Sequence, residues 1–233
     1  ITRDLEAFKS KGISGVNLIC TGGYAGDKAL LGVEWLSSDW CALYQHAVRE
    51  AKRLDIELGF NLAGGWTMMG PWVTHDNAMK KVVFSDTIVY GGRNFSGLLK
   101  QPETIDGYYR NIWVQAFRIE DQSKKLIDPS SCVDLTNLLK PNGELEWKVP
   151  SGEWLILRSG YTLTGHPWSR WFAYPKGDTF AEGAGYEIDY LSKKALEDHF
   201  NYLGKLIINE TKKAGGELAY FWSDSWECGK LTW

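Results

Sequence analysis

Hydrophobic residues recur along the chain with two different periods, one of three to four positions and one of two. Helical spacing behind a capping residue predicts three helices: residues 2–11, a helix capped by Ser37 or Ser38, and a helix capped by Ser192 and ended by Gly215. Short runs rich in β-branched and aromatic residues predict a strand after each helix: residues 13–20, 56–61 and 217–222. This order of elements favours an α/β array of parallel strands.

The period changes between residues 82 and 161. Strands separated by Gly- and Pro-containing turns are predicted there: residues 82–90, 112–119, 145–149 and 154–161. We interpret this part as a β-rich insertion whose last strand returns to the main sheet. The predicted fold class is α/β, a partial (β/α)8 TIM-type barrel with a β-rich insertion. Its expected parts are residues 1–81 as the first part of the barrel, 82–161 as the insertion, and 162–233 as the continuation of the barrel, truncated before its end.

Composition excludes several classes of protein. The 26 basic and 29 acidic residues give a net charge of −3, so the basic surface that a nucleic-acid partner requires is missing. No apolar run reaches the length of a membrane span, and we expect no membrane-spanning segment. The four cysteines are scattered without a CxxC pair and support neither a disulfide framework nor a zinc site.

Aromatic residues are unusually frequent, with 12 Trp, 11 Tyr and 9 Phe. Several tryptophans, including Trp66 and Trp226, are flanked by Gly, Ser or acidic residues in predicted loops. Flat rings with a polar edge suit stacking against the C–H faces of sugars, whereas phosphate ligands call for basic residues and Gly-rich turns. The aromatic excess therefore points towards a carbohydrate ligand.

The residues that carry chemistry follow the predicted strands of the α/β array. The set combines acids, an amide, a histidine and two tryptophans: Asn61, Trp66, His166, Glu187, Asp189, Asp224, Trp226 and Glu227. The sequence contains no P-loop, no GxGxxG motif and no nucleophile elbow. Glycoside hydrolysis requires such a set, because it uses one carboxyl group to protonate the leaving oxygen, a second carboxylate, and hydrogen bonds to sugar hydroxyls.

Glu227 is the candidate proton donor. It lies beside Trp226, and an apolar neighbour disfavours the charged form of a carboxyl group. The alternative is a structural acid that caps a following helix. Asp224 is expected to contact substrate or to orient Glu227, with helix capping again as the alternative. Asn61 is predicted to hydrogen-bond a sugar hydroxyl, and a turn-forming asparagine is the competing interpretation.

Two further pairs complete the candidate site. Glu187 and Asp189 share one face if the segment is extended. The alternative for Asp189 is a position just before the cap of the third helix. Trp66 and Trp226 are expected to wall the sugar subsite. His166 is a candidate substrate ligand, and an exposed histidine without a role is the alternative.

These residues and their surroundings resemble glycoside hydrolase family 106, the α-L-rhamnosidases. The matching pieces run along nearly the whole chain: ITRDLE at 1–6, KGISGV at 11–16, ELGFN at 57–61, GGW at 64–66, GPWVT at 70–74, GEW at 152–154, residues 158–165, GYEIDYLSK at 185–193 and DSWECG at 224–229. Two stretches depart from the family pattern, Leu62-Ala63 and the loop from His166 to Asp178, and they concern substrate preference more than chemistry.

The resemblance implies a (β/α)8 catalytic barrel, inversion of configuration, and a calcium ion near the sugar-binding subsite. Glu187 and Asp189 are the expected carboxylate ligands of this ion, because two hard oxygen ligands on one face would suit it, and Asp224 is a further candidate ligand. Glu227, in the Asp-Ser-Trp-Glu motif, matches the general acid of the family. The general base of the family lies on a later barrel strand, beyond Trp233. The implied partner is a rhamnose-containing oligosaccharide or glycoside, and the implied location is periplasmic or extracellular.

The expected function is that of an inverting α-L-rhamnosidase fragment that releases terminal rhamnose from glycans. As a half barrel with unpaired edges, the fragment is expected to be inactive by itself. One alternative is a non-catalytic carbohydrate-binding protein on a degenerate barrel. Another is a glycosidase of different sugar specificity.

Overall fold

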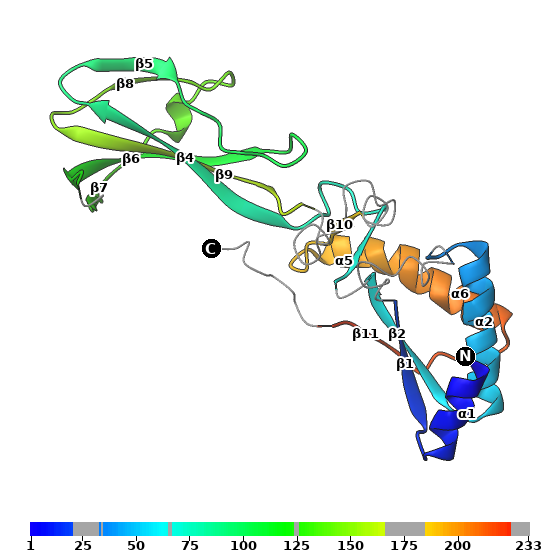
Figure 1. Ribbon diagram of the computed structural model, residues 1–233. Coiled ribbons are helices and arrows are strands. Elements are labelled where there is room, and N and C mark those ends of the chain that lie inside the picture. Colours follow the sequence, from blue (N-terminus) through cyan, green and yellow to red (C-terminus); the bar gives the residue numbers. More distant parts are fainter. Residues whose placement is uncertain (21–32, 34, 65–66, 124–125, 166–184, 225–233) are drawn as a thin grey trace. The chain divides into compact units, whose positions relative to one another are not determined.

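The computed structural model describes residues 1–20, 33, 35–64, 67–123, 126–165 and 185–224. The described residues form two compact units (Figure 1). The first unit comprises those from Ile1 to Met79 and from Gly165 onwards, and the second those from Lys80 to Thr164. Each unit has a hydrophobic core of its own.

The first unit is built around a parallel sheet of three strands, in the order β1-β2-β11. Its strands are β1 (Gly15–Cys20), β2 (Glu57–Gly64) and β11 (Tyr220–Trp222). Its helices are α1 (Thr2–Ser10), α2 (Ser38–Arg53), α5 (Lys193–His199), the π-helical segment η3 (Phe200–Gly204) and α6 (Lys205–Lys213). A short antiparallel pair, β3 (Met69–Gly70) and β10 (Tyr186–Glu187), completes the unit.

The helices begin where the sequence predicts. The Ser37 hydroxyl accepts a hydrogen bond from the Trp40 N–H at 3.2 Å, which satisfies one of the free donors of the first turn of α2. Ser192 caps α5 in the same way, accepting from the Ala195 N–H at 3.2 Å. The predicted third helix is confirmed in place, but η3 interrupts it between α5 and α6.

The core of this unit lies between the parallel sheet and the helices, which cover one side of it (Figure 1). Phe60, at the centre of β2, has no exposed surface. Its ring meets the edges or faces of Trp40, Tyr44 and Phe221 at nearly right angles, with centroids 5.7–6.5 Å apart. Such T-shaped contacts fix the position of β2 beneath α2.

The second unit is antiparallel β structure. Its strands are β4 (Lys80–Tyr90), β5 (Asn94–Leu98), β6 (Arg110–Asp121), β7 (Leu126–Asp134), β8 (Glu144–Lys148) and β9 (Glu153–Leu163), with the 3-10 turn η2 (Thr136–Leu138) before β8. They form a four-stranded sheet in the order β4-β9-β6-β7 and the pair β5-β8. Inward-facing residues such as Val114, Leu145 and Ile156 are fully buried in the core of this unit.

Strand β4 is an edge strand that pairs with β9 along its entire length. The register runs without a bulge from Lys80 opposite Leu163 to Tyr90 opposite Glu153. Alternate residues of β4 face away from the core of the unit, and Val82 and Phe84 are about 70% exposed. Because of this register, Lys80 at the start of β4 lies opposite Leu163 at the end of β9.

The predicted partial (β/α)8 barrel is wrong. In the part of the chain that the structure describes, helices and strands do not alternate around a barrel; three strands pair in parallel and the other eight belong to small, mainly antiparallel sheets. The last strand of the β-rich part also does not return to the main sheet, because β9 pairs with β4 and β6. Among the described strands of the second unit, only β6 and β7 are both consecutive in the chain and paired, whereas β4 pairs with β9 and β5 with β8 across long stretches of sequence that local periodicity does not reveal.

Candidate active site

The two faces of the parallel sheet differ in chemistry. Leu58, Phe60 and Phe221 pack into the core beneath the helices. Because side chains alternate along a strand, Asn61 on β2 and Trp222 on β11 lie on the opposite face. The two residues are direct register partners, so they occupy the same level of neighbouring strands near their carboxyl ends.

Two residues earlier on β2, Gly59 lies on the same face, opposite Asn17 on β1 and Tyr220 on β11. Its surroundings are also polar and crowded. A Cβ atom added to Gly59 would lie 2.3 Å from Asn17 Oδ1 and 2.4 Å from the Tyr220 ring. The Asn17 and Tyr220 side chains therefore converge over Gly59 from the two neighbouring strands, and only glycine leaves room for them. This arrangement confirms that the face away from the helices carries amide and aromatic groups.

Asn61 is fully buried, and its amide is only partly satisfied. Its Oδ1 accepts the Ala63 N–H at 3.0 Å. Because an N–H group must meet an acceptor, this bond fixes the orientation of the amide and directs Nδ2 away from the strand. Nδ2 is buried without a hydrogen-bond partner among the described residues. A buried donor left unsatisfied costs about 1–3 kcal/mol. The structure places Asn61 inside β2, which continues to Gly64, rather than in the loop after it.

Trp222 shares this property, and sequence analysis overlooked it. Its Nε1 is buried and has no acceptor among the residues that the structure describes. An indole N–H is a donor only, and it usually finds a partner when it is buried. The signal available in the sequence was position alone, since Trp222 is the last residue of a strand that ends next to the acidic motif.

His199 supports the end of β2 from the helix side. Its Nε2 lies 2.7 Å from the Leu62 carbonyl oxygen, and Trp72 Nε1 donates to its Nδ1 at 3.2 Å. Because the indole N–H is a donor, Nδ1 must be the unprotonated nitrogen, so Nε2–H donates to Leu62. Trp72 also stacks on Tyr202 in the π-helical segment, with centroids 4.2 Å apart. This network, also missed by sequence analysis, fixes the residue next to Asn61.

Burial lowers the pKa of His199, because the charged imidazolium is poorly solvated there; the hydrogen bond to Leu62 opposes this effect in part. The unfolded chain therefore binds a proton near the ordinary value of about 6.5, where the folded protein does not. We expect the free energy of unfolding to fall as the pH drops below about 6.5, by at most about 1.4 kcal/mol per pH unit for this group.

Chemical unfolding curves between about pH 5 and 8 would measure this dependence in the wild type and in His199→Gln. The variant should be less stable throughout but should lose this part of the slope. His75→Gln, at an exposed position, is the matched control and should keep the wild-type slope. Equal slopes in wild type and His199→Gln would contradict the assignment.

Of the predicted acids, the structure describes three. Asp224 follows β11 and is partly buried, two residues beyond Trp222 at the same edge of the sheet. Glu187 on β10 is 1% exposed. Asp189 accepts the Leu191 N–H through Oδ1 at 3.0 Å, a turn that leads into the cap of α5. This hydrogen bond gives Asp189 a place in the turn before α5, and whether it also binds calcium stays a prediction.

The geometry does not test the calcium prediction, which stays a prediction. Glu187 and Asp189 flank Ile188, which bridges to Ala78, so they are two oxygen donors two residues apart. Within the described ranges, however, no group of three or more His, Cys, Asp or Glu side chains is placed to hold a metal ion. The two carboxylates alone fall short of the six to eight oxygen ligands that calcium takes.

Four predicted site residues lie outside the described residues: Trp66, His166, Trp226 and Glu227. The structure gives no geometry for them. What it does assign is the edge from which the segment carrying Trp226 and Glu227 departs, because Asp224 is the last described residue before it.

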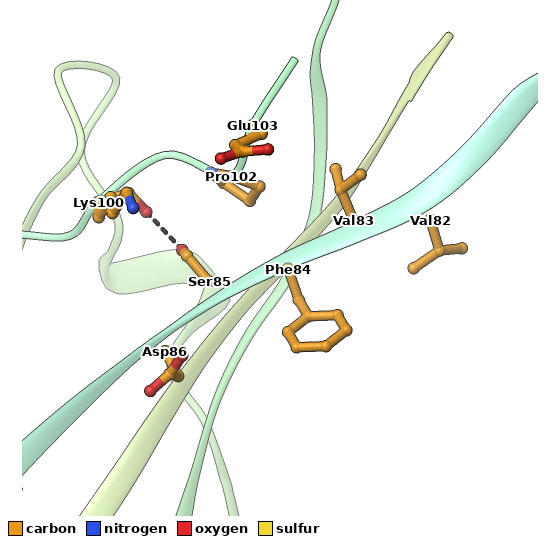
Figure 2. Close-up of a pocket in the computed structure, with 8 residues that line it drawn as sticks. All are labelled: Val82, Val83, Phe84, Ser85, Asp86, Lys100, Pro102 and Glu103. Atoms are coloured by element: carbon orange, nitrogen blue, oxygen red, sulfur yellow. Dashed lines mark hydrogen bonds between the residues drawn. The ribbon is translucent and has the colours of Figure 1, made fainter. Parts of the chain in front are cut away.

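A pocket of about 420 Å³ lies beside β4 in the second unit. Figure 2 shows Val82 and Phe84 on one side of the strand and Ser85 on the other, where its hydroxyl donates to the Lys100 carbonyl oxygen at 2.5 Å. Glu103 also lines this pocket. It contains none of the predicted site residues, so the candidate site remains the carboxyl end of the parallel sheet.

A buried, hydrogen-bonding edge of this kind suits an enzyme that binds polyhydroxylated ligands, and sequence comparison identifies the class as the glycoside hydrolases. The sequence profile of family 106, described as α-L-rhamnosidase, matches residues 1–126 and 114–233. The chain belongs to the α-L-rhamnosidase family, glycoside hydrolase family 106.

Two individual proteins are similar to the chain. A protein of Formosa agariphila named "Putative beta-glucuronidase" is 36% identical over 268 aligned positions that cover all of this chain. The solved structure of a rhamnosidase from Novosphingobium sp. PP1Y matches 92% of the chain with a TM-score of 0.63 and 19% identity, which shows a shared fold. The chain spans 22% of the first protein and 35% of the second.

None of the described helices combines the length and apolar character needed to cross a membrane.

Proposed function

We propose that the protein containing this chain is an inverting α-L-rhamnosidase that releases terminal rhamnose from glycans. Membership of the family supports this activity. The structural observation that carries the proposal is the buried Nδ2 of Asn61 at the carboxyl end of the parallel sheet, which has no hydrogen-bond partner among the residues that the structure describes. A protein site lined by an unsatisfied donor gains most from a ligand rich in oxygen acceptors, as a sugar is.

In the proposed reaction, Glu227 donates its proton to the glycosidic oxygen while the bond between that oxygen and the anomeric carbon breaks. A second carboxylate, on a segment beyond this chain, takes a proton from the water that attacks the opposite face of the sugar. Inversion leaves room for this water when the two carboxyl groups lie roughly 6.5–9.5 Å apart. Asp224 binds substrate or orients Glu227.

The remaining predicted residues would shape the sugar subsite. Trp66 and Trp226 stack on the ring of the sugar, and His166 hydrogen-bonds one of its hydroxyls. Calcium is part of the proposal on family grounds, with Glu187 and Asp189 as the carboxylates that would bind it. Its chemistry would be to hold sugar hydroxyls, and no reaction step is assigned to it. A periplasmic or extracellular location, also proposed on family grounds, would be tested by cell fractionation.

A second candidate is a glycosidase that removes uronic acid units. The observation favouring it is the name of the Formosa agariphila relative, which covers the whole chain at 36% identity. A uronate carries a carboxylate where rhamnose carries a methyl group, so the two substrates differ in charge at one position. Non-catalytic carbohydrate binding is the third candidate function.

The test is turnover of aryl α-L-rhamnoside and aryl β-D-glucuronide by the parent protein, before and after removal of divalent metal with a chelator. Cleavage of the rhamnoside alone supports the proposal, and cleavage of the glucuronide alone replaces it with the second candidate. Cleavage of neither substrate, with sugar binding retained, favours non-catalytic carbohydrate binding.

We expect activity to fall on chelation of divalent metal and to return when Ca²⁺ is added. Unchanged activity after chelation would remove calcium from the proposal.

A further inference from the structure

We propose that Asn61 and Trp222 act together as a two-donor hydrogen-bonding pair that binds oxygen atoms of one sugar unit and so determines which glycosyl group enters the site. The inference rests on the proposed function, because it assumes a sugar at the carboxyl end of the parallel sheet. It adds Trp222 to the site and assigns both residues the same chemical task.

The geometry of the sheet brings the two donors together. Asn61 and Trp222 are register partners on adjacent parallel strands, which lie about 4.8 Å apart. Their side chains leave the same face, the one that also carries Asn17 and Tyr220. Backbone pairing on both sides of β2 holds the two residues at one level, so the two donors belong to neighbouring positions of one face.

Burial explains why these donors are suited to a ligand rather than to solvent. Asn61 Nδ2 and Trp222 Nε1 are both inaccessible to water in the described structure, and neither has a protein acceptor there. The bond from Ala63 to Oδ1 prevents the Asn61 amide from turning its oxygen towards the site. The pair therefore offers only N–H groups, and it requires acceptor oxygens from whatever binds.

The hydrogen bonds of His199 and Trp72 hold the backbone beside Asn61, and the Ala63 N–H holds its side-chain amide. His199 holds the Leu62 carbonyl from the helix side of the sheet, directly after Asn61 in the chain. A donor held in this way loses little conformational freedom when a ligand binds. A ligand that lacks the matching acceptor should therefore lose nearly the full free energy of that hydrogen bond. The pair should therefore select for a particular hydroxyl of the sugar.

The experiment compares the parent protein with Asn61→Asp and Trp222→Phe. Asn61→Asp keeps the oxygen that accepts from Ala63 and removes the donor, and Trp222→Phe removes the indole N–H while keeping an aromatic ring. Asn17→Asp, on the same face but exposed, is the charge-matched control. For each protein, kcat/KM is measured on an aryl α-L-rhamnoside and on its 2-, 3- and 4-deoxy analogues.

For the wild type, we expect one of the deoxy analogues to lose about tenfold or more in kcat/KM, since a buried donor is then left unpaired. In Asn61→Asp or Trp222→Phe, the parent substrate should lose a similar factor, and the penalty for that same missing hydroxyl should nearly vanish. Asn17→Asp should keep the wild-type pattern. Penalties that are unchanged in both variants would overturn the proposal.

The outcome separates this inference from the proposed function. A wild type that cleaves no rhamnoside contradicts the function, and the pair is then tested by calorimetric titration with L-rhamnose and D-glucuronate. Affinity for either sugar that weakens about tenfold in Asn61→Asp supports the pair, and equal affinities in wild type and variants overturn it. Circular dichroism of each variant confirms folding, and if Asn61→Asp does not fold, Trp222→Phe alone decides.

Discussion

Glu227→Gln in the parent protein is expected to lower turnover of a rhamnosyl disaccharide by about two orders of magnitude or more, and turnover of an aryl α-L-rhamnoside by much less. An alcohol leaving group needs a proton as the glycosidic bond breaks, whereas a phenolate leaves readily without one. Loss of the general acid therefore affects the disaccharide most. Steady-state kcat and kcat/KM on both substrates measure the difference.

Glu217→Gln is the matched control, because Glu217 is an exposed residue just before β11 in the same part of the chain. It should leave both substrates unaffected. Normal turnover of the two substrates by Glu227→Gln would show that Glu227 is a structural acid, and the proposed mechanism would then be wrong. An equal loss on both substrates would show a role that does not depend on the leaving group.

Phe60→Ala is expected to lower the free energy of unfolding by about 3–5 kcal/mol. Phe60 has no exposed surface, and its ring contacts Trp40, Tyr44 and Phe221. Removing the ring leaves a cavity that three rigid aromatic side chains cannot collapse to fill. Because β2 carries Asn61 as the next residue, the variant should also weaken substrate binding.

Chemical unfolding with a single probe of tertiary structure, such as near-UV circular dichroism, measures this loss. Leu43→Ala is the control: Leu43 lies on α2 with 45% of its surface exposed, and its loss should cost only about 0.5 kcal/mol or less. A Phe60→Ala variant as stable as the control would show that the aromatic cluster does not hold β2 to the helices.

Local signals in the sequence predict the longer helices and many of the strands, but β3, β5, β7 and β10 were not predicted. Ser37 and Ser192 cap helices because a hydroxyl and the N–H three residues later are neighbours in any such turn. The alternating run before Tyr90 lies in β4, and the aromatic run before Asp224 contains β11. The family is confirmed as well, because its motifs are contiguous pieces of sequence.

The arrangement of those elements could not be read in the same way. Which strands pair depends on contacts between residues far apart in the chain, and three helix–strand repeats were compatible with a barrel that the described residues do not form. Nor does apolar spacing reveal the π-helical segment that begins at Phe200, where the helix beside Trp72 changes its hydrogen-bonding pattern. Trp222 and His199 escaped notice because their unpaired or buried nitrogens are properties of the packed structure.

The long antiparallel pairing of β4 with β9 has a consequence for how the chain folds. Trp222 must find Asn61 across about 160 residues of chain, and an encounter over such a distance has a large entropic cost. Once Lys80 lies opposite Leu163, the second unit becomes a closed side branch and the path between the two strands shortens by about half. By the usual logarithmic dependence on loop length, this lowers the closure cost by about 0.6 kcal/mol. If the β unit forms first, the parallel sheet of the first unit, to which it contributes no strand, should therefore assemble faster.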